Sequence, residues 1–231
     1  MKTYRILILL GISLITACET NDEPRAENLV FDYNFATDNE AWIGDFADYP
    51  LGDEEFYELN FEYSTLPETL DQTKGALKIS GNNHSDDLFM FVKRKISGLT
   101  PNKSYNIIFN IEFASNVADG QFGVGGSPGE SVYIKAGASP QEPLKVLDSD
   151  EWYRINIDTG NQAQEGDDMI VLGDFSNDTE QNIYILKTLS NSSRFTAMSN
   201  MNGELWLIVG TDFGFEATTT IYYNRIKATL N

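Results

Sequence analysis

The chain has one cysteine and one histidine in 231 residues. A single cysteine forms no disulfide within the chain and supplies no clustered thiolates for a structural zinc site. A single histidine excludes metal centres built on two imidazoles. A Ser-His-Asp site would have to use His84, which lies in a polar stretch without the pattern of a nucleophile elbow. We therefore predict a solvated or turn-capping role for His84.

Basic residues are also scarce. The chain has 16 Lys and Arg against 35 Asp and Glu, and its formal net charge is −19. Nucleic-acid binding depends on neutralising phosphates with Lys and Arg, so the charge balance excludes that partner. It also disfavours adsorption to anionic lipid headgroups. Two interpretations of the acidity remain open: it keeps an exposed protein soluble, or part of it binds divalent cations.

A long apolar run occurs only at the beginning of the chain. Residues 6–15 are apolar except for Gly11 and Ser13, two basic residues precede them, and Ala17 and Cys18 follow. This is the pattern of a secretory signal peptide, and it is too short for a stable membrane span. A cysteine directly after a small residue resembles the bacterial lipobox. The resemblance implies a signal peptide over residues 1–17 and lipidation of Cys18, with the acyl chains as the only membrane link.

Residues 18–28 are polar, acidic and free of periodicity, and they predict a flexible tether. Acidic residues directly behind a lipidated cysteine resemble the surface-export signals of Bacteroidota lipoproteins. The resemblance implies a protein outside the cytoplasm, anchored to a bacterial membrane. The outer membrane, and from there the cell surface, is the expected place.

From Leu29 onward the apolar residues recur with a period of two. Residues 105–113 place five apolar side chains on one face and mostly polar ones on the other, as in a half-buried strand. Residues 87–93 are apolar on both faces and predict an interior strand or one that lines a covered groove. Asp119-Gly120 and Asn202-Gly203 are hairpin signals. Further strands are predicted at residues 131–135, 152–157, 183–186, 205–209 and 219–223.

Sustained helical periodicity is absent, because no segment of twelve or more residues keeps a 3.6-residue apolar repeat. The sequence therefore predicts an all-β protein with an antiparallel β-sandwich. No linker interrupts residues 29–231, and we expect one domain there.

Three stretches resemble the galactose-binding-like jelly rolls of bacterial carbohydrate-binding modules: residues 28–35 with Trp42 behind them, residues 98–105, and residues 221–230. The resemblance implies a jelly-roll-like sandwich and a glycan or polysaccharide ligand. Asn224 stands where an aspartate of these modules often helps to hold calcium. The substitution weakens the inference that this position binds calcium here. Residues 125–137 and 203–210 also resemble an uncharacterised family of secreted bacterial proteins, which implies no activity.

Residues 42–57 are the densest part of the chain in aromatic and acidic residues. Aromatic faces stack on sugar rings, and carboxylates accept sugar hydroxyls or bind Ca²⁺. One hypothesis is a ligand site with Trp42, Tyr49 and Trp152, supported by structural Ca²⁺ at Asp45, Asp48 and Asp53. The alternative is a covering loop whose aromatics cap the core and whose acids face water. Trp206 lies in an apolar run and is expected in the core.

Residues 120–129 are rich in glycine, but no helix pattern follows them. Without a helix N-terminus this segment is not a phosphate-binding loop. We predict a loop between strands in which glycine adopts positive φ or allows close backbone approach.

Three functions remain at this point. The first is a lipid-anchored envelope protein that recognises a polysaccharide or glycan without catalysis. The second is a structural or assembly lipoprotein that contacts another envelope protein. The third is a glycoside hydrolase with an unassigned pair of carboxylates.

Overall fold

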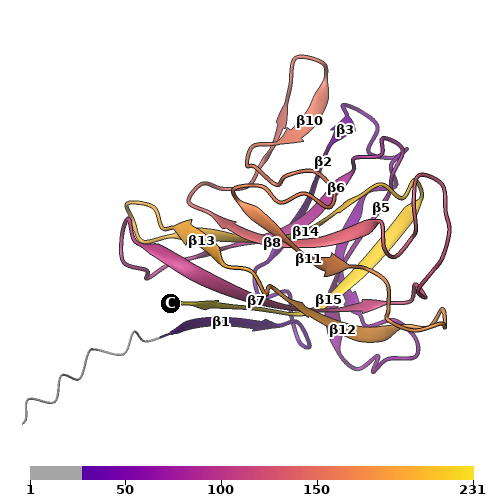
Figure 1. The fold of residues 1–231 in the computed structure, drawn as a ribbon, viewed down its shortest axis with the longest axis horizontal. Helices are drawn as coiled ribbons and strands as arrows, with labels where there is room; N and C mark the ends of the chain where they lie inside the picture. The colour runs from indigo at the N-terminus through magenta and orange to yellow at the C-terminus, as the bar shows by residue number, and fades with distance from the viewer. Residues whose placement is uncertain (1–27) are drawn as a thin grey trace, which may run out of the picture.

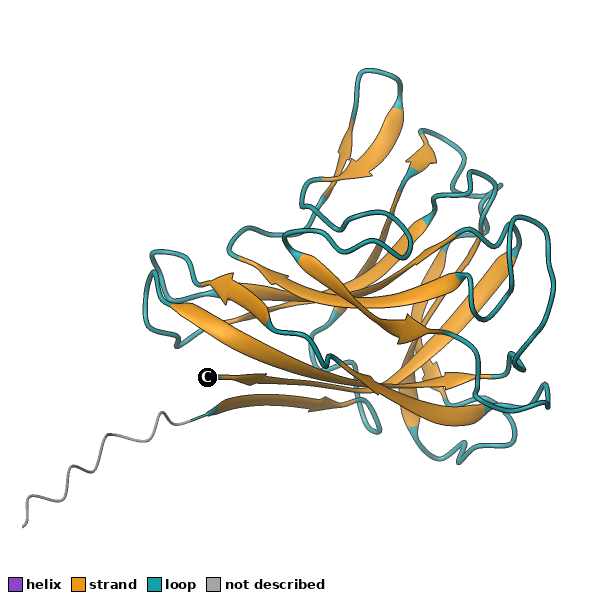
Figure 2. Ribbon diagram, viewed as in Figure 1, coloured by secondary structure: helices purple, strands orange, loops and turns teal. Residues whose placement is uncertain are grey.

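The computed structural model describes residues 28–231, and this part of the chain consists of strands and loops (Figures 1 and 2). None of these residues forms a helix that could span a membrane. The predicted signal peptide, Cys18 and the tether up to residue 27 lie outside the described residues. The fifteen strands are β1 (Leu29–Asn34), β2 (Ile43–Ala47), β3 (Tyr49–Pro50), β4 (Asn60–Thr65), β5 (Gly75–Asn82), β6 (Phe89–Ile96), β7 (Ser104–Ser115), β8 (Val132–Ser139), β9 (Lys145–Leu147), β10 (Trp152–Ile155), β11 (Met169–Asp174), β12 (Ile185–Ser190), β13 (Phe195–Met198), β14 (Leu205–Phe213) and β15 (Thr218–Leu230).

The strands form two large antiparallel sheets and one small one. The seven-stranded sheet has the order β12-β7-β15-β5-β4, with β1 also paired to β15 and β13 to β7. The five-stranded sheet has the order β11-β8-β14-β6-β2, and the small sheet has the order β3-β10-β9. Figure 1 shows β10 standing clear of the two large sheets, at the top of the view. The predicted all-β antiparallel sandwich is confirmed.

One hydrophobic core fills the space between the two large sheets. On β7, Tyr105, Phe109 and Phe113 are buried, whereas Ile108 on the opposite face is exposed. They pack in one cluster with residues of the other sheet such as Val209 of β14. The period of two that predicted this strand thus follows from one covered and one uncovered face.

Strand β6 is covered on both faces, as its sequence predicted. Met90 and Val92 point into the main core, while Phe89 and Phe91 belong to a second, smaller cluster. That cluster also contains Ile157, from the segment after β10. The outer face of the five-stranded sheet is therefore buried locally under this segment.

The two predicted hairpins are turns between different sheets. Gly120 and Gly203 have positive φ angles, 70° and 69°, as tight turns require. However, β7 and β13 belong to the seven-stranded sheet, and β8 and β14, which follow them, belong to the five-stranded sheet. The local turn signal was correct and the strand pairing was wrong, because burial of the apolar faces decides the pairing.

The beginning and the end of the described chain lie side by side. Leu29 of β1 pairs with Leu230 of β15 along the edge seen in Figure 1. Strand β15 is the longest strand, with 13 residues, and its other end begins at Thr218. The two ends of β15 therefore lie at opposite ends of the sandwich.

Candidate functional site

Trp42, the first predicted ligand-binding residue, belongs to the core. It is 1% exposed, and its ring meets Tyr33 and Phe35 edge-on at centroid distances of 5.6 and 6.2 Å. A ring packed in this way has no free face for a sugar. The burial supports the covering-loop interpretation for this residue.

Tyr49 is also buried, and Trp152 is only partly covered. The Tyr49 ring is fully buried against Tyr153, and its hydroxyl accepts a hydrogen bond of 2.9 Å from Nζ of Lys145. Trp152 lies on β10 with the guanidinium of Arg154 4.8 Å from its ring centroid. The three aromatic residues therefore do not form one exposed stacking surface.

Trp206 was expected in the core, but the structure places it outside the core. It is half-buried on β14, with Nζ of Lys93 5.6 Å from its ring centroid. The neighbouring Leu205 and Leu207 point into the core instead. Trp206 therefore lies on the outer face of its sheet.

The predicted calcium ligands are not gathered into one site. Asp45 makes an ion pair of 3.4 Å with Lys145, and Asp48 makes one of 3.0 Å with Arg154. Within residues 28–231, no group of three or more His, Cys, Asp or Glu side chains could hold a metal ion. Asp45, Asp48 and Asp53 thus do not come together as the sequence predicted.

A charged cleft lies beside β10. Arg154 is at its centre, and the guanidinium reaches Asp48 at 3.0 Å, Asp87 at 3.4 Å and Asp148 at 3.4 Å. The hollow has a volume of about 230 Å³. Its ten lining residues are Asp48, Asp87, Arg154, Ile155, Ile157, Asp158, Thr159, Gly160, Asn161 and Asp212.

Burial and mutual repulsion raise the pKa values of three carboxyl groups in this cleft. Burial raises the pKa of Asp48 to about 6, against the partial compensation of the hydrogen bond from Arg154. Burial also raises the pKa of Asp87, and the charge of Asp212 adds to the effect. The pKa of Asp212 is itself raised by burial, although Lys135 opposes the shift. Such perturbed groups in a hollow are typical of functional sites.

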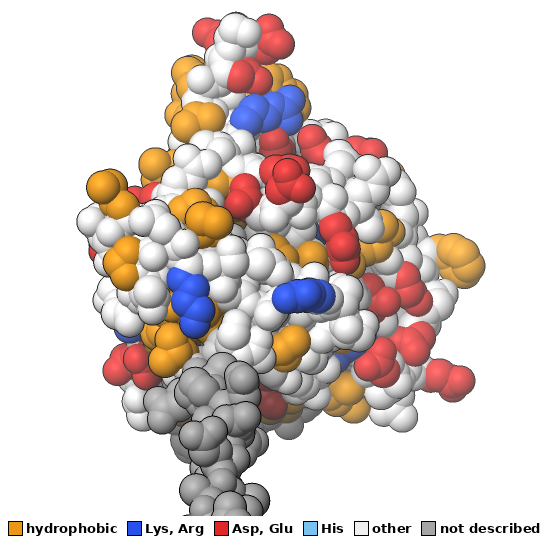
Figure 3. Space-filling view, turned by 60° about the vertical axis from the view of Figure 1, so that its left-hand side comes forward, with side chains coloured by type: hydrophobic (Ala, Val, Ile, Leu, Met, Phe, Trp, Pro, Cys, Tyr) orange, Lys and Arg blue, Asp and Glu red, His pale blue; other side chains and the backbone are white. Residues whose placement is uncertain are grey.

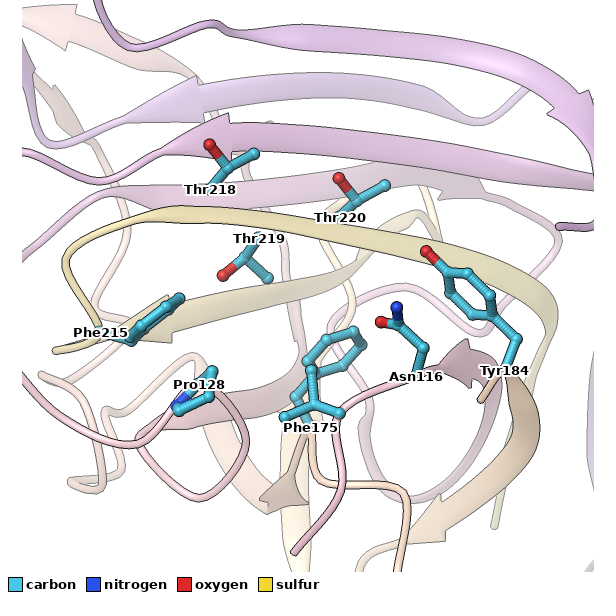
Figure 4. A pocket seen from close by; sticks show the side chains of 9 residues that line it. Asn116, Pro128, Phe175, Tyr184, Phe215, Thr218, Thr219 and Thr220 are labelled. Carbon is cyan, nitrogen blue, oxygen red and sulfur yellow. The ribbon is translucent and has the colours of Figure 1, made fainter. Parts of the chain in front are cut away.

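A second, neutral hollow lies at the end of the sandwich where β15 begins (Figure 4). Its volume is about 190 Å³. It is formed where β7 and β11 end and where β12 and β15 begin. The lining residues are Asn116, Val117, Pro128, Phe175, Tyr184, Phe215, Thr218, Thr219 and Thr220, and none is charged.

Alternation along β15 determines which hydroxyl faces this hollow. In Figure 4, Thr219 points toward Phe175, whereas Thr218 and Thr220 point to the other side of the strand. The hydroxyls of Thr218 and Thr220 are bonded to Glu58 and Ser80. The Thr219 hydroxyl has no hydrogen-bond partner among the described residues.

Asn116 and two aromatic rings complete the hollow. The Asn116 amide makes no hydrogen bond to another residue of the 28–231 segment, so its donor and acceptor are both free. Tyr184 and Phe215 lie on opposite sides of the group in Figure 4, and both are partly exposed. The Tyr184 ring is held edge-on by Tyr222 at 5.7 Å. The hollow therefore combines apolar ring surface with uncommitted neutral hydrogen-bonding groups.

The glycine-rich segment forms one wall of the neutral hollow through Pro128. Gly125 has a φ of 72°, and a β-carbon there would overlap the carbonyl oxygen of Gly214. A β-carbon on Gly123 would overlap the ring of Phe215. The predicted roles of glycine, positive φ and close backbone approach, are confirmed here. The loop packs against the β14–β15 connection because it lacks side chains.

Sequence reasoning missed the residues of the neutral hollow. They come from five separated places in the chain, near residues 116, 128, 175, 184 and 215–220, and no local motif unites them. One available signal was the glycine-rich segment, which the prediction treated only as a loop. Another was the run Thr218–Thr220, whose alternation places one hydroxyl apart from the other two.

No protein-family model matches the chain, and no curated protein matches it. Several solved structures are similar to it. A candidate sugar-binding protein from Bacteroides thetaiotaomicron is 6% identical with a TM-score of 0.43, over 82% of this chain and 88% of that one. The carbohydrate-binding module TmCBM27, studied for mannan recognition, is 13% identical with a TM-score of 0.38, over 89% and 99%. The module TmCBM61, solved with β-1,4-galactotriose, is 8% identical with a TM-score of 0.37, over 81% and 87%. These values do not assign a ligand to this chain.

Proposed function

We propose that the protein recognises a glycan or polysaccharide without catalysis, and that the neutral hollow is the site. The observation that carries the proposal is its lining: aromatic rings of Tyr184 and Phe215 beside the free groups of Asn116 and Thr219. A sugar ring offers a C–H face to an aromatic ring and hydroxyls to neutral donors and acceptors.

The size of the hollow limits what enters it. A volume of about 190 Å³ holds only a few water molecules, each with a share of about 30 Å³ in the liquid. We therefore expect one sugar residue to occupy it, as a chain end or a branch. Two of the solved structures named above are carbohydrate-binding modules, so this ligand class has precedent among β-sandwiches.

The location belongs to the proposal as well. Cys18 and the preceding apolar run support a lipid-anchored protein outside the cytoplasm, at the outer membrane or the cell surface. A glycan at the envelope is consistent with that place. Ca²⁺ enters the proposal only as a condition to be varied.

The test is a glycan-array screen of the full chain in detergent, with Ca²⁺ and again with a chelator. We expect binding to a defined glycan, and calorimetry should then show at least tenfold weaker binding for Asn116→Ala and Tyr184→Ala. Trp152→Ala is the matched control, because it removes an aromatic ring far from the hollow, and it should bind as the unmodified protein does. Equal loss in all three variants, or no glycan bound in either condition, contradicts the proposal.

One feature favours a second candidate, contact with another envelope protein. The projecting strand β9 forms an edge of the small sheet and exposes Val146 and Leu147, which are 44% and 49% exposed. Leu144, just before the strand, is 41% exposed. Unpaired edge strands with apolar side chains pair readily with other chains. Crosslinking in the intact envelope, compared between the unmodified protein and Val146→Lys, tests this candidate.

A further inference from the structure

The charged cleft contains one buried carboxylate that is only half satisfied. In Asp212, on β14, Oδ2 accepts hydrogen bonds from Nζ of Lys135 at 3.1 Å and from the backbone N–H of Gln162 at 2.6 Å. Its other oxygen, Oδ1, is buried and has no hydrogen-bond partner among the described residues. The Asp212 side chain is 5% exposed and lines the hollow. A buried carboxylate oxygen without a donor is costly and points to a missing partner.

Asp48, between β2 and β3, lines the same hollow and is less buried, with 18% of its side chain exposed. Its Oδ1 is bound by Arg154, while its Oδ2 has no donor within the 28–231 segment. Its backbone has a φ of 63°, a conformation that few non-glycine residues adopt. The strained residue is fixed by its N–H bond to the carbonyl of Tyr153 at 2.6 Å. The fold therefore fixes the backbone of Asp48 beside the cleft, and Arg154 holds its side chain there.

The remaining groups of the cleft do not supply the missing donors. Asp87 uses one oxygen for Arg154 and the other for the amide of Asn161 at 3.3 Å. Asp158 accepts from the backbone N–H groups of Gly160 and Asp167. Four carboxylates thus line the hollow beside a single guanidinium, and within residues 28–231 the one other cation paired with any of them is the buried Lys135, which contacts Asp212. Negative charge is in excess.

We infer that this cleft binds a ligand through a primary ammonium group. Such a group carries positive charge and three N–H donors, which matches the buried Asp212 oxygen that lacks a donor and the second carboxylate, Asp48, that lines the same hollow. A metal ion fits less well, since the described residues provide no group of three or more ligands for one. This site is separate from the neutral hollow, and the inference stands or falls independently of the proposed function.

The raised pKa values of Asp48, Asp87 and Asp212 agree with this geometry. Burial and the neighbouring carboxylates disfavour the charged forms, and a bound cation opposes both effects.

The experiment compares matched pairs of probes that differ in charge. Calorimetry on the full chain near pH 7.5 measures glucosamine against glucose, and cadaverine against 1,5-pentanediol. We expect binding of at least one amine and none of its uncharged partner. Binding of both amines identifies the ammonium group alone as sufficient, and binding of glucosamine alone assigns the site to amino sugars. Both results support the inference.

Variants locate the binding. Asp48→Asn and Asp212→Asn should weaken amine binding at least tenfold, because each removes a charge that the ammonium contacts. Asp150→Asn, which changes an exposed aspartate on the turn before β10, should leave it unchanged. Asp212→Asn deprives buried Lys135 of its partner and is used only if it folds; Asp48→Asn keeps the test decisive. Amines that bind no better than their uncharged partners, or unchanged binding in Asp48→Asn, overturn the inference.

Discussion

Individual buried side chains of this protein combine favourable packing with unsatisfied polar atoms. The Trp42 ring is enclosed by aromatic neighbours, yet its Nε1 is buried without an acceptor among the described residues. The hydroxyl of Tyr223 is in the same situation. An unsatisfied donor of this kind costs about 1–3 kcal/mol. The apolar contacts of the ring oppose this cost.

Trp42 should accordingly behave as a core residue. Trp42→Ala should lower the free energy of unfolding by about 3–5 kcal/mol, and Trp42→Phe by less, because phenylalanine also removes the unpaired N–H. Trp152→Ala, at a half-buried position, should cost about 1 kcal/mol. Urea denaturation of the three variants measures this. If Trp152→Ala lowers the free energy of unfolding as much as Trp42→Ala does, the prediction that Trp42 is the core residue of the two is wrong.

Asp48 should make stability depend on pH. Its pKa is about 6 in the folded protein, against an ordinary value of 3.8, so the folded state holds a proton that the unfolded state has released. The contribution is fully present below pH 4 and is lost as the pH rises through 6. Relative to Asp48→Asn, the unmodified protein should therefore lose about 2–3 kcal/mol of unfolding free energy between pH 4 and pH 7.5.

Urea denaturation of both proteins at half-unit pH steps gives this difference directly. Asp150→Asn serves as the control for a general charge effect, since Asp150 is exposed. A difference between Asp48→Asn and the unmodified protein that stays constant over the whole range contradicts the assignment.

At the residue scale, the sequence shows which residue types occur together, but it did not predict whether their side chains are buried or available to a ligand. The stretch from Trp42 to Tyr57 does contain aromatics beside acids, but a covering loop and a binding loop share that pattern. Which one forms depends on neighbours that are distant in sequence, such as Lys145 beside Tyr49 and Arg154 beside Asp48. The lone His84, predicted in a solvated turn, is exposed and stacks on Phe56 at 4.0 Å.

At the scale of elements, the glycine-rich loop lines the neutral hollow because its glycines have no side chains and allow close packing. Gly125→Ala should lower the unfolding free energy by about 1–3 kcal/mol, because positive φ and overlap with the Gly214 carbonyl both oppose a β-carbon. Gly52→Ala is the matched control: its φ is 87°, but nothing lies within 4 Å of the added carbon. It should cost about 1 kcal/mol.

The same pair of variants distinguishes the loop's effect on binding. Gly125→Ala should also weaken the binding of the glycan in the neutral hollow, whereas Gly52→Ala should leave the affinity unchanged. Thermal melts and calorimetry on both variants check the two expectations. Equal costs for the two substitutions would exclude steric overlap at Gly125.

Some strands were predictable, and their partners were not. The sequence predicted strands at the positions of β6, β7, β8, β10, β12, β14 and β15, but it did not predict β4, β5 or β11. Alternation identified β7, and continuous apolar character identified the doubly covered β6, because both patterns report burial of a strand's own faces. Pairing depends on contacts between distant segments. The short strand β13 was missed for this reason: its four residues are stabilised by pairing with Ile107 and its neighbours on β7.

At the scale of the whole molecule, acidic side chains are distributed rather than concentrated. They are scattered over the face in Figure 3, from the projecting hairpin downward, with few basic residues among them. This agrees with a general solubilising role for most of the acidity, while the charged cleft accounts for a small part of it.

Attachment to a membrane is the remaining expectation for the whole chain. Cys18→Ser should move the protein from the membrane fraction to the soluble fraction of lysed cells, because it removes the acylated thiol while residues 28–231 stay unchanged. Fractionation followed by immunoblotting measures this. Ser13→Ala, within the predicted signal peptide, should not change the distribution. Continued sedimentation of the Cys18→Ser protein with membranes would refute lipid anchoring.

Strand β15 runs between the neutral hollow and the side of the protein that such an anchor would hold. It begins at the neutral hollow and ends beside Leu29, where the described chain starts. Thirteen residues span at most about 40 Å when fully extended, and the irregularity between Tyr223 and Arg225 shortens this distance. A protein held by its N-terminal side would thus have the neutral hollow at the opposite end of β15 from the anchor. The longest strand would keep the opening away from the attachment point, and the predicted tether over residues 18–28 would add its own length to that separation.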